Sequence, residues 1–340
     1  MTLNKERLSL VAGIALSVFF LWLSLKDTDF ARIGQALARS ELVFALPLLA
    51  ALALFYWFKA LRIRMLLIPI RPIRIQGILP AMMIGFAANN LLPARLGEVV
   101  RVYLLGRQHN LSKTSILATM VIERLFDLLA ALGLLALVVI VTQVPGTLIK
   151  PGYFVGGLEL ALLCITTVMI MWTAVFVRLC QWATSFLPSA LQSIVTRHIE
   201  LGAAGTHALK QPRLLLGIGA TSVVQNLLKA AAMYLGVLAL GIDVPLSAAL
   251  VLVALSIAAM TLPGAPGFFG TIQLCYVLAL KPYGIDPSDA FAASIFYHVL
   301  EYFAVTATGF YYLKDIGQDL GRIRKDVESS AEAVDTPAGR

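Results

Sequence analysis

Three arginines and three carboxylates recur at three- and four-residue spacing in two short stretches of this chain, at Arg95, Glu98, Arg101, Glu123, Arg124 and Asp127. Residues with this spacing share one face of a helix, so each carboxylate can hold a neighbouring guanidinium in place. Arginine stays charged and presents a planar fork of donors that matches a phosphate group. The pattern therefore predicts a phosphate-binding site in which Arg95, Arg101 and Arg124 are the cations.

Further polar side chains lie within apolar stretches elsewhere in the chain, and we expect them to support this site. A charge at the centre of a membrane helix costs about 2.5 to 3.5 kcal/mol, so it is usually retained for a function. Lys229 and Glu301 have a second interpretation, a structural ion pair in which Lys229 neutralises Asp127 or Glu301. The predicted supporting network comprises Asn89, Asn90, Glu98, Glu123, Asp127, Lys229, His298 and Glu301.

Helix-breaking residues interrupt two apolar stretches of the chain, 78–97 and 246–280. Both interruptions contain a Pro-x-x-x-Gly sequence, at residues 93–97 and 266–270. Broken backbone at membrane depth is tolerated where it lines a cavity, and a helix beginning near Gly97 would add its positive end to an anion site. We predict hinges at Pro93, Gly97, Pro263, Pro266, Gly267 and Gly270, with Gln273 as the polar group after the second break.

The composition of the chain indicates the elements that must position these residues. Of 340 residues, 59% are hydrophobic and 14% are charged, whereas a soluble domain carries about 25% charged residues. The chain is therefore predicted to be an all-α polytopic membrane protein. Its net charge of +8 lies largely in short loops between apolar runs, which favours anionic lipid headgroups over nucleic acid as partners. The three cysteines lack paired spacing, and we expect no disulfide, metal or cofactor.

Six apolar runs are long enough to cross a bilayer, at residues 8–25, 42–58, 115–141, 154–177, 214–240 and 290–312. The two interrupted stretches are predicted to be re-entrant or broken elements, and the chain has 8 spans if both cross. Basic residues after the second run predict a cytoplasmic loop there and hence cytoplasmic N- and C-termini, and these residues are Lys59, Arg62, Arg64, Arg71 and Arg74.

The order of these runs predicts one membrane domain at residues 1–314, followed by a partly disordered cytoplasmic tail at 315–340. Within the domain, each interrupted element follows the second apolar run of a half. The halves, 8–142 and 154–312, would have opposite orientations and form an inverted repeat with broken helices near its centre. Such an arrangement is typical of transporters.

Three motifs resemble the lysylphosphatidylglycerol synthase transmembrane family, also called flippase-like domain proteins. They are the run from Asn89 to Arg101, the sequence Glu123-Arg124-Leu-Phe-Asp127, and the run from Pro266 to Gln273. The similarity covers residues 8–314 and implies lipid translocation. Many relatives carry Glu where this chain has Gln273, so a mechanism that couples a proton at that carboxylate would differ here.

The resemblance also bears on cargo and partners. Relatives with a C-terminal aminoacyltransferase-like domain make and translocate aminoacylated phosphatidylglycerol, and we expect this chain to be a stand-alone membrane region without that domain. Other relatives accompany glycosyltransferases that act on polyprenyl phosphates. The leading prediction is therefore a non-enzymatic flippase of a prokaryotic plasma membrane, whose cargo is a phospholipid or a polyprenyl-linked lipid.

Two alternatives stay open at this point. The chain could be an integral-membrane transferase that uses a lipid-phosphate donor, with Asp27 and Asp29, or Glu98 and Glu123, as its acid–base groups. It could also be a non-catalytic subunit that positions a separately encoded glycosyltransferase or aminoacyltransferase. No G-x-x-x-x-G-K-[ST] sequence is present, which argues against ATP hydrolysis by this chain.

Overall fold

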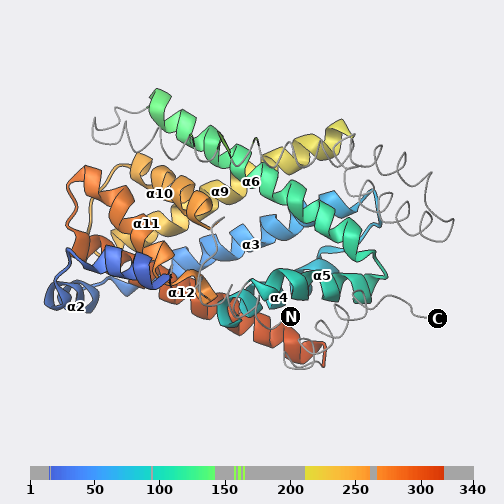
Figure 1. Cartoon of the computed structure of the whole chain (residues 1–340), viewed down its shortest axis with the longest axis horizontal. Coiled ribbons are helices and arrows are strands. Elements are labelled where there is room, and N and C mark those ends of the chain that lie inside the picture. Colours follow the sequence, from blue (N-terminus) through green and yellow to red (C-terminus); the bar gives the residue numbers. More distant parts are fainter. Residues whose placement is uncertain are drawn as a thin grey trace.

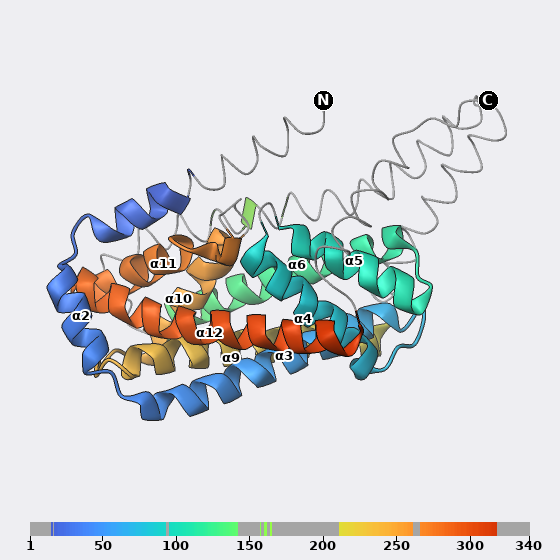
Figure 2. The same cartoon turned by 90° about the horizontal axis from the view of Figure 1, so that it is seen from below.

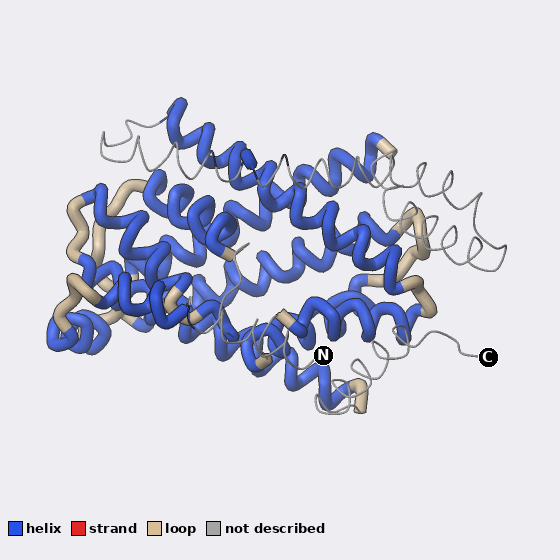
Figure 3. Tube along the Cα trace, in the orientation of Figure 1, coloured by secondary structure: helices blue, strands red, loops and turns tan. Residues whose placement is uncertain are grey.

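Helices joined by short loops make up the part of the chain that its computed structural model describes, and no strand occurs there (Figure 3). The described residues are 15, 17–92, 95–141, 157, 160–161, 164, 211–260 and 266–317. Three of their helical segments are long and apolar enough to cross a membrane, Leu42–Leu67, Pro212–Leu238 and Pro287–Asp315. The prediction of an all-α membrane protein is confirmed.

Four long helices form the frame of the molecule (Figure 1). They are α3 (Ala45–Leu67), α6 (Lys113–Val141), α9 (Pro212–Leu238) and α12 (Pro287–Asp315). Their lengths of 23 to 29 residues exceed the roughly 20 that a bilayer core requires. The start of α12 is well defined in sequence, because Asp286 caps it by accepting from Ser288 N at 2.8 Å and Pro287 suits its first turn.

The first interrupted stretch forms a helical hairpin of α4 (Ile75–Leu91) and α5 (Leu96–His109). Its two open ends meet, because His109 Nε2 lies 3.0 Å from the carbonyl oxygen of Gly77. Gly97 permits the close packing of α5 against α4 near the other end: a Cβ there would lie 1.9 Å from the carbonyl oxygen of Gly85. The chain thus returns to the side from which it entered, as a re-entrant element does, while Pro93 lies outside the described residues.

The second interrupted stretch repeats this design with α10 (Leu246–Ala259) and α11 (Thr271–Leu280). Its open ends also meet, since Ser247 Oγ lies 3.3 Å from the hydroxyl of Tyr283. At the tip, the short helix η3 (Pro266–Phe268) includes Gly267 with φ of +68°, and Gly270 follows with φ of +82°. Glycine adopts these angles without a steric penalty. Pro263, the remaining predicted hinge, lies outside the described residues.

The two hairpins enter from opposite ends of the molecule, as both perpendicular views show (Figures 1 and 2). The long helices α3 and α9 pack antiparallel. Glu41 N, just before α3, donates to the carbonyl oxygen of Ala239 at the end of α9. A long helix, a hairpin and a second long helix therefore occur twice in opposite directions, which is the arrangement that an inverted repeat predicts.

The helix that contains the second predicted span continues nine residues beyond position 58, to Leu67. Lys59 and Arg62 consequently lie within α3, with exposed fractions of 9% and 0%, so the assignment of these two residues to a cytoplasmic loop is wrong. Their burial is possible because α6 supplies carboxylates that face them. Arg64 also belongs to α3, whereas Arg71 and Arg74 do lie in the connection to α4. Most of the predicted span 154–177 and of the tail after 317 lies outside the described residues.

Candidate functional site

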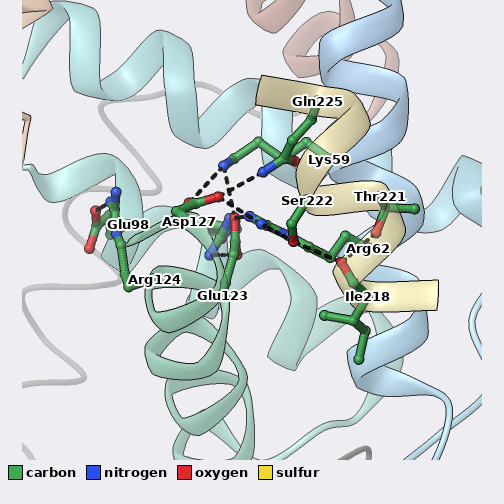
Figure 4. Close-up of polar contacts among 11 residues, drawn as sticks. Lys59, Arg62, Glu98, Glu123, Arg124, Asp127, Ile218, Thr221, Ser222 and Gln225 are labelled. Atoms are coloured by element: carbon green, nitrogen blue, oxygen red, sulfur yellow. Dashed lines mark hydrogen bonds and ion pairs between the residues drawn. The ribbon is translucent and has the colours of Figure 1, made fainter. Parts of the chain in front are cut away.

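Arg62 is the most deeply buried charge of the protein's described part, and sequence reasoning missed it as a site residue. Its Nη1 lies 2.7 Å from Asp127 Oδ1 and 3.0 Å from Ser222 Oγ, and its Nη2 lies 3.3 Å from a carboxylate oxygen of Glu123. Gln225 Nε2 donates to the same oxygen of Asp127 at 2.7 Å (Figure 4). This arginine therefore joins α3, α6 and α9 in one polar cluster.

Glu123 contacts three cations, Lys59, Arg62 and Arg101. One of its oxygens lies 3.1 Å from Lys59 Nζ, and the other accepts from Arg101 Nη2 at 3.0 Å. Lys59 Nζ also lies 3.6 Å from an Asp127 oxygen. The predicted roles of Glu123 and Asp127 as holders of cationic side chains agree with these contacts, although two of the cations, Lys59 and Arg62, come from α3.

Arg124 points away from the cluster and pairs with Glu98 of α5 (Figure 4). The sequence spacing allowed it to pair with Asp127, but that carboxylate is taken by Arg62. The side chains of Arg124 and Glu98 are 46% and 32% exposed, in contrast to the buried cluster beside them. Arg124 is thus the accessible cation of the predicted set.

The tips of the two hairpins meet at the third predicted arginine. Arg95 has a left-handed backbone with φ of 55°, and its guanidinium lies 5.4 Å from the ring centroid of Phe268 in η3. Asn90 ties the first tip to α12 by donating to Thr306 Oγ1 at 3.0 Å. The Oδ1 of Asn89 is buried and has no hydrogen-bond partner within the described residues. A ligand donor could satisfy this oxygen.

The second half carries its own ion pair, between Lys229 of α9 and Glu301 of α12. The hydroxyl of Tyr56 in α3 donates to the same carboxylate at 3.0 Å. Of the two partners that the sequence offered to Lys229, the structure selects Glu301. The side chains of Lys229 and Glu301 are 10% and 12% exposed, so this pair too is largely removed from solvent.

Gln273 organises the tip of the second hairpin. Its Oε1 accepts from Gly270 N at 2.7 Å, and its Nε2 lies 3.1 Å from His298 Nδ1. His298 Nε2 lies 2.8 Å from the carbonyl oxygen of Gly267, which can only accept. The hydrogen-bond pattern therefore assigns a neutral imidazole with its proton on Nε2. Gln273 thus acts as a cap and a brace at the second break, next to the predicted hinge residues Pro266, Gly267 and Gly270.

These groups surround a cavity of about 160 Å³ between the hairpin tips. A smaller one of about 40 Å³, lined by Gly97, Arg101 and Glu123, lies beside it. Lys59, Asn89, Glu98 and Arg124 line both. Among the described residues, the two linings hold equal numbers of cations and carboxylates, Lys59, Arg101, Arg124 and Lys229 against Glu98, Glu123, Asp127 and Glu301. Arg62 and Arg95, which contact lining residues, add the positive excess. The excess positive charge favours an anionic ligand.

A family model described as the lysylphosphatidylglycerol synthase TM region matches residues 10–309 of this chain. Glycosyltransferase AglD from Haloferax volcanii is 26% identical over 97% of the chain, which corresponds to 57% of that protein. The chain thus spans little more than half the length of that relative. A UPF0104 membrane protein from Methanocaldococcus jannaschii is 25% identical over 65% of the chain and 90% of the relative. No solved structure matches.

Proposed function

The chain belongs to the lysylphosphatidylglycerol synthase transmembrane family, and from this premise we propose that it translocates a phosphate-bearing lipid between the leaflets of its membrane. The cargo class is a phospholipid or a polyprenyl-linked lipid. The headgroup would enter the cavity between the hairpin tips, and the acyl or prenyl chains would stay in the bilayer.

The observation that carries this proposal is the excess of positive charge around that cavity. A net positive charge within a membrane protein is expensive, and a phosphate supplies compensating negative charge. A cavity of about 160 Å³ has room for a headgroup but not for the hydrocarbon chains of a lipid. The inverted hairpins provide two gates of similar construction, one toward each end of the molecule.

In this proposal the three predicted arginines bind the headgroup, and they differ in their access to the cavity. Arg124 would meet the phosphate first, because its side chain is 46% exposed and lines the larger cavity. Arg95 would contact the headgroup from the hairpin tip, and Arg101 from the smaller cavity. Glu98 and Glu123 orient Arg124 and Arg101, while Asp127 holds Arg62.

Translocation can be measured in proteoliposomes by dithionite quenching of NBD-labelled phosphatidylglycerol, phosphatidylcholine and polyprenyl phosphate. We expect Arg124→Gln to reduce wild-type translocation of an anionic lipid by about tenfold or more. Arg32→Gln is the matched control, because it removes the same charge from an exposed ion pair outside the cavity lining. Failure of wild type to move any of these lipids, beside an active control flippase, would refute the proposal. Full activity of Arg124→Gln would refute the assigned role of that arginine.

A second candidate function is that of a membrane subunit or membrane region that serves a glycosyltransferase. The similarity to the protein named Glycosyltransferase AglD favours it, because the match covers nearly the whole of this chain but only 57% of that protein. The version in which this chain itself uses Asp29 as an acid–base group has less support, since that carboxylate caps α2 (Phe30–Ala38) by accepting from Ala31 N. Asp27 is exposed in the preceding turn. Copurification of a glycosyltransferase, with no translocation by this chain alone, would favour the subunit function.

A further inference from the structure

We propose that Lys229 forms a second phosphate-binding station, the counterpart in its half of Lys59, which lines the first site beside Arg101 and Arg124, and that the headgroup passes between the two lysines. This inference rests on the proposed lipid translocation and assigns it a second binding site.

The two lysines have equivalent surroundings in the inverted arrangement. Lys59 lies on α3, the first long helix of its half, and pairs with Glu123 on α6, the last helix of that half. Lys229 lies on α9, the first long described helix of the other half, and pairs with Glu301 on α12, which closes it. Each pair therefore joins the long helices that flank its own hairpin. The structural repeat brings two like sites to one interface, where transporters of this architecture bind their cargo.

One aromatic ring connects the two sites. Lys59 Nζ lies 5.8 Å and Lys229 Nζ lies 5.3 Å from the centroid of the Phe55 ring. These distances are within the range of cation–π attraction. Both lysines line the larger cavity, so an anion can move from one ammonium group to the other within that cavity.

The second site also has donors to offer a ligand. A lysine ammonium has three N–H donors, and Glu301 accepts from that of Lys229. The neighbouring Asn226 is 3% exposed, lines the same cavity, and its Nδ2 has no hydrogen-bond partner within the described residues. An amide assigned in this orientation would donate to a phosphate oxygen. A purely structural Lys229–Glu301 pair leaves this buried donor unexplained.

The test separates binding from transfer. The double variant Lys229→Gln with Glu301→Gln removes both charges of the second site, and so avoids leaving one buried charge without its partner. If the station exists, binding of short-chain phosphatidylglycerol to the purified variant changes by less than about threefold, because the first site is intact. Translocation of NBD-phosphatidylglycerol in proteoliposomes falls by about tenfold or more. Thr308→Val is the control, since its hydroxyl bonds only a carbonyl of its own turn, that of Ala304, in the described contacts.

Each other outcome overturns the two-station proposal. Normal translocation by a folded double variant means that the pair serves packing alone, and loss of both binding and translocation means that one undivided site exists. If the double variant does not fold, the test uses the wild-type protein and measures acylation of Lys229. Saturating short-chain phosphatidylglycerol should protect Lys229 from acylation, and short-chain phosphatidylcholine should protect it less. Equal labelling of Lys229 with and without the anionic lipid refutes the station. Failure of the proposed function itself is recognised separately, by a wild-type protein that translocates no lipid.

Discussion

Arg62 and Asp127 form an ion pair of 2.7 Å in which the arginine side chain is fully shielded from solvent. The pair connects α3 to α6, and Gln225 of α9 donates to the same aspartate oxygen. Such a pair is costly to bury, and its geometry therefore matters more for the shape of the site than for net stability. It holds the central helices in the register that places Lys59 and Glu123 beside the cavity.

Removing the Arg62 side chain alone should destabilise the protein strongly. Arg62→Met leaves Asp127 buried without its nearest cation, at an expected cost of about 3–5 kcal/mol in the free energy of unfolding. The double variant with Asp127→Leu should recover much of this loss, because no charge is then left unpaired. Thermal unfolding of the purified protein in one detergent compares the three chains, and a single variant as stable as wild type would contradict the structural role.

The close packing of α4 against α5 should not accept a side chain at Gly97. In Gly97→Ala the new Cβ would overlap the carbonyl oxygen of Gly85, where the two lie only 1.9 Å apart, so α4 and α5 must separate. We expect a lower unfolding temperature and weaker translocation. Gly133→Ala in α6 is the matched control, because no atom lies within 4 Å of its added Cβ. That change should be neutral or stabilising by up to about 1 kcal/mol through helix propensity. Equal behaviour of the two variants would argue against the close packing of the hairpin.

The brace around Gln273 predicts how a carboxylate would behave at this position. In Gln273→Glu the side chain can still accept from Gly270 N, but it can no longer donate to His298 Nδ1. The contact is restored when the new carboxyl group and His298 together take up one proton, on either group. Relative to wild type, the variant should therefore be more stable at pH 6 than at pH 8.

Unfolding temperatures of both proteins across this pH interval measure that difference. Gln273→Ala is the control, because it removes the bond at every pH. A variant whose stability relative to wild type is the same at both pH values would contradict the predicted proton uptake between pH 6 and pH 8.

The cap of α12 by Asp286 predicts that the stability of the fold depends on pH. The backbone hydrogen bond from Ser288 is the main reason that the pKa of Asp286 is lowered, and the charge of Arg32 adds to it. A lowered pKa stabilises the fold above the ordinary pKa of aspartate, and this contribution is lost as the pH falls through the value in the folded protein.

Asp286→Ala should cost about 1 kcal/mol at neutral pH through loss of the cap. Asp286→Asn should retain most of the stability at neutral pH, because asparagine also caps helices, and should lose less stability than wild type between pH 5 and pH 3. Unfolding temperatures across that interval are the measurement. An identical acid response of wild type and Asp286→Asn would mean that the carboxylate contributes nothing through its charge.

The sequence by itself determined the class of the protein and the places where its helices break. Apolar runs of spanning length can satisfy their backbone in a membrane only as helices, so the composition was sufficient for the all-α prediction. Glycines such as Gly97, Gly267 and Gly270 marked the hairpin tips, because a close backbone approach or a positive φ excludes most other residues there.

Only the tertiary structure decided which charges meet. Helical periodicity shows that Arg124 and Asp127 can share a face, but it does not show that a cation 65 positions before Asp127 will take that carboxylate. Lys59 and Arg62 read as loop residues because positive charge after an apolar run usually marks a membrane boundary. The packing of α3 against α6 and α9 changed their role, since opposite charges from other helices made their burial possible.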